Sequence, residues 1–438
     1  MHLLHGNCKY GETMGEIILT PKYDDRFPVE CDMITPDNFF GKSNEEIQAV
    51  KLWKSSVQYP LSEFFDVKGD GQGTESAADI HIIIDGTVPK MKLIGYSMTT
   101  GKITVNGDVN YHVGCEMKGG EIEVNGNAGS WAGREMEGGT IIIHGNAGDH
   151  IGGSYRGKWE GMLGGRIVID GNAGSSVGDG LVKGTIIVKG NVEAFCGIRQ
   201  SGGLIYVGGD VLRTIGVEMK KGTIIVEGNI KNFSPGFFEQ TLLKSNEVPS
   251  ELYDEILPYG ANLYSKSYIE YKGDHAFFNK PKGKMYVSAN NNEYLLSCEG
   301  STDRPIEFKG EALKVILNTG STIEQGRIIK GGDKYSPEYK DVCAVCHIHP
   351  DDYQLLGKPE KVKVSSPDGN RSVVVRAEMK DNVQRRNIFI PRSVWANVIV
   401  DAQSVNSGAP IYKGGEAYVQ PTDDEILEAP YIIEQQYK

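Results

Sequence analysis

The chain has 438 residues, more than one hydrophobic core usually holds, so we expect two or three domains. Its 46 basic and 58 acidic residues give a net charge of -12, which argues against a nucleic acid or an anionic membrane surface as a partner. An export signal and a long apolar stretch are absent, and seven scattered cysteines do not form the dense framework of a secreted disulfide protein, so we expect a cytoplasmic chain with reduced thiols.

Short segments precede the central repeat. Residues 17–22, 34–39 and 61–65 have strand-like or helical patterns, and Ile82 and Ile84 repeat the central pattern in a degenerate form. We assign residues 1–100 to an N-terminal flanking region whose last part is a leading coil.

A repeat dominates the middle of the chain. The phrase Gly-x-Ile-x-(Val/Ile)-x-Gly-(Asn/Asp) occurs seven times and opens at Gly101, Gly120, Gly139, Gly165, Gly184, Gly203 and Gly222. Five of the six spacings are nineteen residues. The spacing of twenty-six between Gly139 and Gly165 indicates seven extra residues within or close to 154–160.

Each unit predicts one strand of a parallel β-helix, which spans residues 101–230 in coils of about 19 residues. Apolar residues two positions apart bury one face of each strand, and the first of each pair is an isoleucine: Ile103, Ile122, Ile141, Ile167, Ile186, Ile205 and Ile224. A glycine follows each strand, where we expect a corner with positive φ: Gly107, Gly126, Gly145, Gly171, Gly190, Gly209 and Gly228. We expect the next side chain to bond local backbone in a corner ladder: Asp108, Asn127, Asn146, Asn172, Asn191, Asp210 and Asn229.

The residue between the two apolar positions points outward, and its character changes along the repeat. It is polar in the first two units, as Thr104 and Glu123, and then large and apolar: Ile142, Val168, Ile187, Tyr206 and Ile225. We expect a partner protein or another segment of this chain to cover this face, the alternative being an idle apolar patch. We expect Ile187→Lys to weaken assembly without unfolding the repeat.

The inserted residues include Tyr155, Arg156, Lys158 and Trp159. Extra residues in a repeat cost little stability and often lie at a binding surface, so we expect contact with another protein of an assembly. A solvated loop is the alternative.

Three of the repeat units extend to Gly-x-x-Gly-x-x-x-Gly, at Gly126, Gly129 and Gly133; Gly145, Gly148 and Gly152; and Gly171, Gly174 and Gly178. This pattern resembles the repeat shared by the C-terminal β-helix of glutamate synthase and by the C subunit of formylmethanofuran dehydrogenase. The flanks favour the dehydrogenase, because no large synthase body accompanies the repeat. Residues 231–289 resemble the C-terminal extension of the same dehydrogenase component, and we expect residues 290–311 to be a polar linker.

Residues 312–438 predict a compact β-rich domain without the nineteen-residue period. Residues 313–320 form an apolar strand that ends in Asn-Thr-Gly, where backbone amides and a hydroxyl can approach a phosphate. Residues 349–357 predict a short helix with Pro350 at its first position. Residues 361–365 and 372–376 flank Pro-Asp-Gly and predict a hairpin.

This order of elements resembles the molybdopterin dinucleotide-binding domain, a double-psi β-barrel, and in particular the D subunit of formylmethanofuran dehydrogenase. The matching phrases are Leu-Asn-Thr-Gly-x-Thr-Ile-Glu-Gln-Gly at residues 317–326 and Trp-Ala-Asn at residues 395–397. The resemblance implies a set of cofactor-binding residues: Asn318, Thr319, Gly320, Thr322, His349, Asp351, Arg392, Trp395, Asn397 and Lys413. It places the first four along the dinucleotide, Asp351 near guanine, and Asn397 with Lys413 near a pterin. Three of these residues also have a purely structural explanation. Asp351 suits the first turn of a helix, Asn318 suits a turn, and Trp395 suits a hydrophobic core.

Cys343 and Cys346 suggest a metal site, but no second ligand pair with suitable spacing accompanies them. The alternation of residues 341–348 predicts a strand that places the two thiols on opposite faces. We therefore expect buried strand cysteines, with no metal ligand and no catalytic residue on this chain.

The two resemblances imply a structural and cofactor-capping subunit of a tungsten or molybdenum formylmethanofuran dehydrogenase, which reversibly reduces carbon dioxide to formylmethanofuran with ferredoxin. The molybdopterin guanine dinucleotide is then shared with a catalytic pterin-binding subunit, and the chain alone is inactive. An amidohydrolase-type subunit and iron-sulfur polyferredoxin-type subunits complete the implied assembly. The alternatives are a non-enzymatic β-helix scaffold and a glutamate-synthase-like module without pterin. Pterin and metal analysis of the native assembly separates the cofactor-capping subunit from the non-enzymatic scaffold.

Overall fold

The computed structural model describes residues 15–22, 27–232, 237, 240–274, 281–295, 308–331, 334, 336–381, 383, 385–400 and 413–436. The chain forms two compact units. The first comprises Met1–Val211, Met219–Gly228 and Val248–Tyr264, and the second comprises Leu212–Glu218, Asn229–Glu247 and Ser265–Lys438. Most of the predicted linker, residues 296–307, lies outside the described residues.

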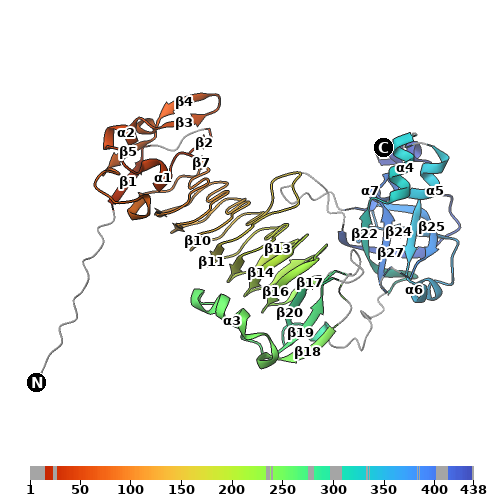
Figure 1. Ribbon diagram of the computed structural model, residues 1–438. Coiled ribbons are helices and arrows are strands. Elements are labelled where there is room, and N and C mark those ends of the chain that lie inside the picture. The colour runs from red at the N-terminus through yellow and green to blue at the C-terminus, as the bar shows by residue number, and fades with distance from the viewer. Residues whose placement is uncertain are drawn as a thin grey trace, which may run out of the picture. The chain divides into compact units, whose positions relative to one another are not determined.

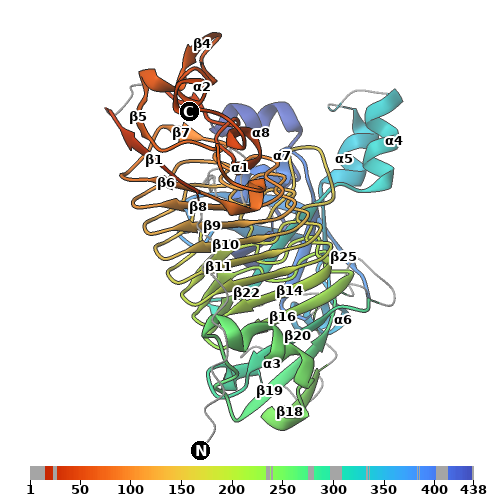
Figure 2. The ribbon, with the colours of Figure 1, turned by 60° about the vertical axis from the view of Figure 1, so that its left-hand side comes forward.

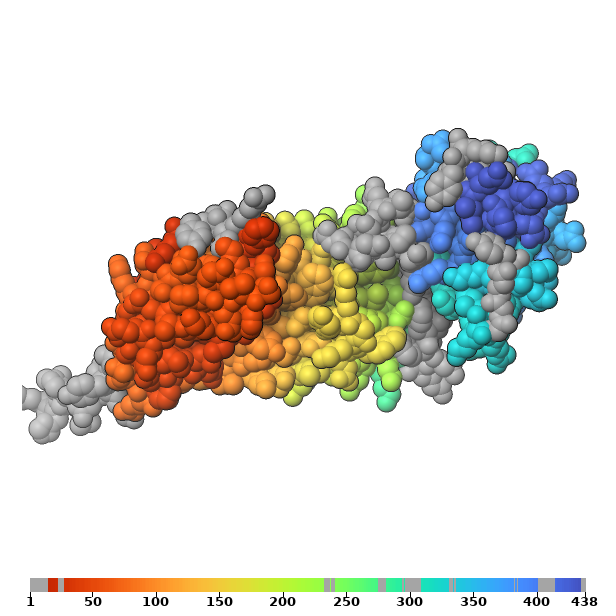
Figure 3. Space-filling model, turned by 90° about the horizontal axis from the view of Figure 1, so that it is seen from above, coloured from red at the N-terminus to blue at the C-terminus, as the bar shows by residue number. Residues whose placement is uncertain are grey.

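The N-terminal flank of the first unit is built from short elements. They are β1 (Gly15–Pro21), β2 (Val29–Glu30), α1 (Pro36–Phe39), α2 (Asn44–Gln48), β3 (Lys51–Lys54), β4 (Val57–Pro60), β5 (Phe65–Lys68), β6 (Ile80–Ile84) and β7 (Met91–Lys92). Thr35 caps α1, and Ser43 and Glu46 form a capping box at α2, which explains where these short helices begin. Strand β1 pairs in parallel with β6, so the flank continues the sheet of the repeat. Figure 3 shows this flank and the first repeat units as one continuous surface.

Every repeat unit contributes one strand to a parallel ladder (Figures 1 and 2). The strands are β8 (Lys102–Val105), β9 (Glu121–Val124), β10 (Thr140–Ile143), β11 (Arg166–Ile169), β12 (Thr185–Val188), β14 (Ser201–Val207) and β16 (Lys221–Val226). Each isoleucine of the repeat pairs with the isoleucine of the next unit, and all seven side chains are fully buried. The leading strand β6 joins in the same register through Ile82 and Ile103.

A second ladder lies at the corner after each strand. Isolated parallel bridges connect Val88, Val109, Ala128, Ala147, Ala173 and Val192 in succession. Beside them, the side-chain oxygen of Asp108 accepts the N–H of Asn127 at 2.7 Å. The same bond recurs at the four following steps, with Asn127, Asn146, Asn172 and Asn191 as acceptors. The corner residues therefore join successive units to one another.

The glycines after each strand do not have the expected positive φ. The left-handed conformation occurs instead at the glycines that open each phrase, such as Gly120 with φ 79°. Gly145 is required for a different reason, because a Cβ there would lie 2.6 Å from the carbonyl oxygen of Gly126 in the preceding unit. The prediction of a glycine corner was right in residue type and wrong in cause: close approach of backbones excludes a side chain.

The chain itself covers the apolar outer face of the later repeat units. Helix α3 (Ser250–Ile256) and the residues after it, up to Tyr264, belong to the same compact unit of the chain as these repeat units. Arg166 contacts Glu255 at 3.0 Å, and Tyr206 donates to the carbonyl oxygen of Asn262 at 2.8 Å. Ile187 is fully buried. The face is therefore covered by another segment of this chain, one of the two expected coverings, and the expectation that Ile187→Lys weakens assembly without unfolding the repeat is wrong, since Ile187 is buried within the chain.

The remaining strands outside the barrel are β13 (Val192–Ala194), β15 (Val211–Arg213), β17 (Ile230–Asn232), β18 (Gln240–Lys244), β19 (Ser267–Lys272) and β20 (Lys284–Ser288). Strands β18, β19 and β20 form an antiparallel meander.

A closed barrel lies in the second unit. Its strands follow the order β22 (Ala312–Gly320), β26 (Asn387–Pro391), β23 (Val345–Ile348), β25 (Ser372–Met379), β24 (Lys361–Ser365) and β27 (Lys413–Pro421), and β27 returns to β22; β21 (Phe308–Lys309) lies outside this ring. The helices are α4 (Ile323–Gly331), α5 (Pro337–Cys343), α6 (Pro350–Leu355), α7 (Val394–Ile399) and α8 (Ala429–Gln436). No helix among the described residues is both long and apolar enough to cross a bilayer.

The two cysteines of the barrel lie in different elements. Cys343 ends helix α5, whereas Cys346 lies in strand β23, so the prediction of one strand over residues 341–348 is wrong at its start. Ser336 caps α5 by accepting the N–H of Tyr339, so a helix begins where the alternation alone predicts the approach to a strand, and this helix ends at Cys343. Both thiols are buried, and burial raises the pKa of each.

Candidate functional site

The barrel separates the predicted cofactor-binding residues into two groups at opposite ends. Strands β22 and β26 run in parallel and lead into α4 and α7, while β23 runs antiparallel to β26 and leads into α6. Figure 1 accordingly shows α4, α5 and α7 at one end and α6 at the other. His349 and Asp351 belong to the α6 end, and the other predicted residues belong to the α4–α7 end.

At the end of strand β22, the side chains of Asn318 and Thr319 are taken up by the barrel itself. Asn318 donates to Asn387 and accepts from the N–H of Gly414, both at 3.3 Å, so its amide is engaged within the barrel. Thr319 is 1% exposed. Gly320 accepts the N–H of Arg392 at 2.9 Å through its carbonyl oxygen. The segment that carries Arg392 is thus fixed to the end of β22, and the Arg392 side chain is exposed.

Thr322 begins helix α4. Its Oγ1 accepts the N–H of Gln325 at 3.1 Å, while the Gln325 side chain faces the Thr322 N–H at 3.4 Å. The pattern Thr-x-x-Gln carries this capping box in the sequence, but Gln325 was not among the predicted residues. Thr322 therefore lies at the N-terminus of a helix, where backbone N–H groups and the helix dipole favour an anion.

Helix α7 carries one buried and one exposed candidate. Trp395 is 1% exposed, and its indole N–H donates to the carbonyl oxygen of Leu427 at 3.1 Å. Asn397 lies on the same helix and is exposed. Trp395 thus serves the barrel core and holds the helix that presents Asn397. Lys413 opens β27 opposite Asn318, and its side chain lies outside the described residues.

At the α6 end, His349 and Asp351 both have a structural role at the start of the helix. His349 is the N-cap of α6 and accepts the N–H of Asp351 through Nδ1 at 3.1 Å. Asp351 lies in the first turn, is 57% exposed, and is 3.6 Å from the Nε of Arg385. Both residues stabilise the helix start.

A buried ion pair at the same end has no signal in the sequence pattern. Asp352 and Arg386 are 1% and 2% exposed, and the carboxylate of Asp352 also accepts the backbone N–H of Arg386 at 2.5 Å. Burial raises the pKa of the Asp352 carboxyl, and the hydrogen bond and charge of Arg386 oppose that shift. Arg386 has a φ of 60°, so the pair stabilises a left-handed residue just before β26.

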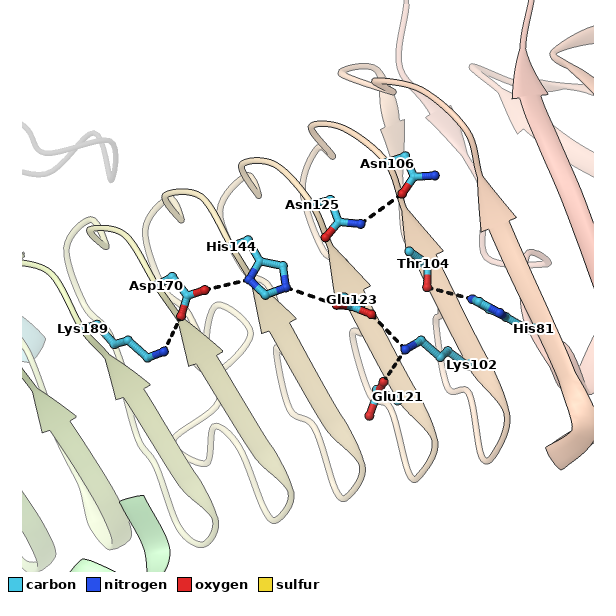
Figure 4. A network of polar contacts seen from close by, with 10 residues as sticks. All are labelled: His81, Lys102, Thr104, Asn106, Glu121, Glu123, Asn125, His144, Asp170 and Lys189. Carbon is cyan, nitrogen blue, oxygen red and sulfur yellow. Dashed lines mark hydrogen bonds and ion pairs between the residues drawn. The ribbon is translucent and has the colours of Figure 1, made fainter. Parts of the chain in front are cut away.

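The outer face of the first five repeat units carries a polar network (Figure 4). His144 lies between Asp170 and Glu123, at 2.7 and 3.2 Å, and Lys189 continues the network beyond Asp170 at 2.7 Å. Hydrogen bonding to Asp170 raises the pKa of His144. Lys102 extends the network on the other side, with Glu123 at 2.9 Å. Ion pairs thus connect successive repeat units on an outer face that residues 248–264 leave partly exposed.

The inserted loop exposes aromatic side chains beside guanidinium groups. Tyr155 and Trp159 are 54% and 71% exposed. Arg134 lies over the ring of Tyr155 at 4.7 Å, and Arg199 lies over the ring of Trp159 at 5.2 Å. Lys158 pairs with Glu135 at 2.9 Å. These contacts order the loop against the repeat, and its contact with another protein of an assembly stays a prediction.

Comparison with protein families places the barrel in a known class. Residues 315–415 match the family described as the Molydopterin dinucleotide binding domain. The match contains both ends of the barrel and all ten of the predicted cofactor-binding residues. The chain therefore carries a molybdopterin dinucleotide-binding domain.

Similarity to individual relatives extends over nearly the whole chain. It is 49% identical over 420 residues to the C subunit of molybdenum-containing formylmethanofuran dehydrogenase 1 from Methanothermobacter thermautotrophicus, covering 95% of this chain and 98% of the relative. Protein FwdD of Methanocaldococcus jannaschii is 33% identical over 130 residues, which cover 28% of this chain and 96% of that protein. The chain belongs to the family of formylmethanofuran dehydrogenase C subunits and joins C-type and D-type parts, which confirms the fused arrangement predicted from its motifs.

A solved structure gives a further likeness. The formyltransferase/hydrolase complex FhcABCD from Methylorubrum extorquens, solved with methylofuran, contains a chain with a TM-score of 0.55 and 29% identity. The likeness covers 62% of this chain and 99% of that chain. That relative is one component of a complex with several subunits.

Proposed function

We propose that this chain is the structural and cofactor-capping subunit of a formylmethanofuran dehydrogenase complex. Its repeat, over residues 101–230, is proposed to be a parallel β-helix that holds other subunits, and residues 312–438 a double-psi barrel that closes over the cofactor. The divisions at 1–100, 231–289 and 290–311 follow from the same assignment. The observation that carries the proposal is the composition of the α4–α7 end, which holds the exposed Arg392, the N-terminus of α4 and the exposed Asn397.

These residues fit a dinucleotide. Phosphate groups require cations and N–H donors, which Arg392 and the start of α4 provide. The exposed Asn397 offers both a donor and an acceptor to a pterin edge, and Gly320 leaves backbone accessible. When bound, molybdopterin guanine dinucleotide would supply the ligands and the redox chemistry of tungsten or molybdenum. This chain would hold the phosphates, orient the pterin and exclude water from one side.

The guanine contact requires a long ligand. Strand β26 has five residues and separates the α4–α7 end from the α6 end by about 16 Å. A ligand that uses both Arg392 and Asp351 must extend along this strand. We therefore assign the phosphates and pterin to the α4–α7 end first, with Asp351 as the guanine contact only if the ligand reaches α6.

The remaining partners are those that the resemblance to formylmethanofuran dehydrogenase implies. A catalytic pterin-binding subunit would supply the other wall of the site, and amidohydrolase-type and iron-sulfur polyferredoxin-type subunits would complete the complex in the cytoplasm. The proposed reaction of that complex is the reversible, ferredoxin-dependent reduction of carbon dioxide to formylmethanofuran. The isolated chain is expected to have no oxidoreductase activity.

Deletion of residues 312–438 tests the cap. The barrel core draws on residues between Leu313 and Ile432, so the deletion removes that core as a whole. The purified complex should lose its pterin, measured by fluorescence after oxidation and by metal analysis, while the partners still co-purify. Stoichiometric pterin with full activity would overturn the cap, and metal-pterin in the isolated full-length chain would overturn the shared site. A wild-type complex that lacks pterin would instead favour a scaffold.

A further inference from the structure

One buried amide connects the segments that carry the proposed phosphate contacts. Gln325 is 3% exposed, and its Nε2 donates to Tyr339 Oη at 3.1 Å and to the carbonyl oxygen of Arg392. Its backbone N–H donates to Thr322 Oγ1 at 3.1 Å. Gln325 thus links the start of α4 to α5 and to the segment that follows β26.

We propose that Gln325 is a positioning residue for the dinucleotide. The inference rests on the proposed function and adds a residue that need not touch the ligand. Gln325 sets the distance between Thr322, at the helix N-terminus, and the backbone that presents the Arg392 guanidinium. These two groups would hold the same anionic ligand, so their separation determines how well both can bind it.

The chemistry of the amide suits this role. A glutamine side chain offers two N–H donors and one acceptor in a single plane. Here both donors have partners in other segments, and the acceptor faces the Thr322 N–H at 3.4 Å. The N–H of Arg392 meanwhile donates to Gly320 at 2.9 Å, so the peptide units on both sides of Arg392 are held. Loss of the Gln325 bond frees one of the two restraints.

The test is Gln325→Met in the intact complex, because methionine keeps the approximate volume and removes every hydrogen bond of the amide. The variant should lose pterin about fivefold faster during dialysis, the change expected from about one neutral hydrogen bond. Oxidised-pterin fluorescence follows the loss. Hydrogen exchange should become faster at the amides of Arg392 and Ser393, which a general loss of barrel stability would not confine to that segment.

Val375→Ala is the matched control. Val375 is fully buried in the barrel core and lies on β25, so its truncation lowers stability without breaking the Gln325 links. Compared at equal distance below their unfolding temperatures, Val375→Ala should keep wild-type pterin loss and Gln325→Met should not. Equal rates for the two variants, or wild-type retention in Gln325→Met, would overturn the inference.

Arg392→Glu separates this result from failure of the proposed function. If Arg392→Glu accelerates pterin loss and Gln325→Met does not, the cap stands and the positioning role falls. If Arg392→Glu also leaves the rate unchanged, the phosphate assignment at the α4–α7 end falls, and the positioning role with it.

Discussion

Asp352 and Arg386 form a buried ion pair at the α6 end of the barrel, although Asp351, one residue earlier, is mostly exposed. Removing one partner leaves the other charge buried and uncompensated. We expect Asp352→Ala to lower the free energy of unfolding of the barrel by about 3–5 kcal/mol. Chemical denaturation of the full chain measures the change.

The neighbouring Asp351→Ala is the control for this ion pair. Because Asp351 is exposed, its loss should cost about 0.5–1 kcal/mol through the helix start alone. Equal effects of the two alanine variants would contradict a special role for the buried pair.

Gly145→Ala should destabilise the repeat by about 1–3 kcal/mol, because the new Cβ would meet the Gly126 carbonyl oxygen of the preceding unit at 2.6 Å. Gly326→Ala is the contrasting variant, because a Cβ at this position of α4 would meet no other atom. Alanine also reduces the conformational entropy of the unfolded chain, so the free energy of unfolding should rise by about 0.5–1 kcal/mol. Thermal unfolding compares the variants. A neutral Gly145→Ala would show that the units can separate to admit a methyl group.

Ile187→Lys should now destabilise the first unit by about 3 kcal/mol or more, since it buries a charge beneath the covering segment. Limited proteolysis should cut residues 248–264 faster in this variant. Thr104→Lys occupies the equivalent outward position on the polar early units and should change little. If Ile187→Lys has wild-type protease resistance, the covering segment does not protect that residue.

The contribution of His144 to stability should depend on pH. Its folded-state pKa is raised, so the stabilisation is fully present below the unfolded pKa of about 6.5 and is lost as pH rises through the folded value. The residue is 42% exposed, so solvent screening keeps the effect small. The difference in unfolding temperature between wild type and His144→Gln should be larger at pH 5.5 than at pH 8.5.

His112 provides a control of opposite sign. Burial lowers the pKa of His112 to about 4, so the neutral ring is favoured in the folded protein and its contribution is lost as pH falls below the unfolded value. The wild-type advantage over His112→Gln should therefore shrink on acidification. The same pH trend for both variants would contradict the assigned causes.

The sequence predicted local features of the fold well, because they depend on short periods. The isoleucine spacing identified all seven strands of the main parallel ladder, although not β13 and β15 at the corner, and the helix after His349 begins at Pro350 as expected. The covering segment could not be found this way, since the contact between Arg166 and Glu255 joins residues 89 positions apart. No local pattern records which distant helix buries an apolar strand position.

The candidate site was predicted less completely than the fold. The Thr-x-x-Gln pattern was present in the sequence, yet the links from Gln325 to Tyr339 and Arg392 depend on the packing of three segments. Trp395 has an apolar ring suited to either a core or a ligand, and only its burial separates the two. The chemistry of a residue type is visible in sequence, whereas its direction depends on tertiary packing.

The corner ladder makes the length of the repeat adjustable in fixed steps. Each step of the ladder is the same hydrogen bond, in which the side-chain oxygen of an Asn or Asp accepts the backbone N–H of the corresponding residue in the next unit. In four of the five steps that residue lies nineteen positions later. Excising residues 127–145 would bring Asn146 to the place of Asn127 above Asp108 and restore an equivalent rung. The molecule would shorten by about 4.8 Å, one strand spacing. The number of units thus determines the length of the repeat, and a change in that number would alter the length without new chemistry at any junction.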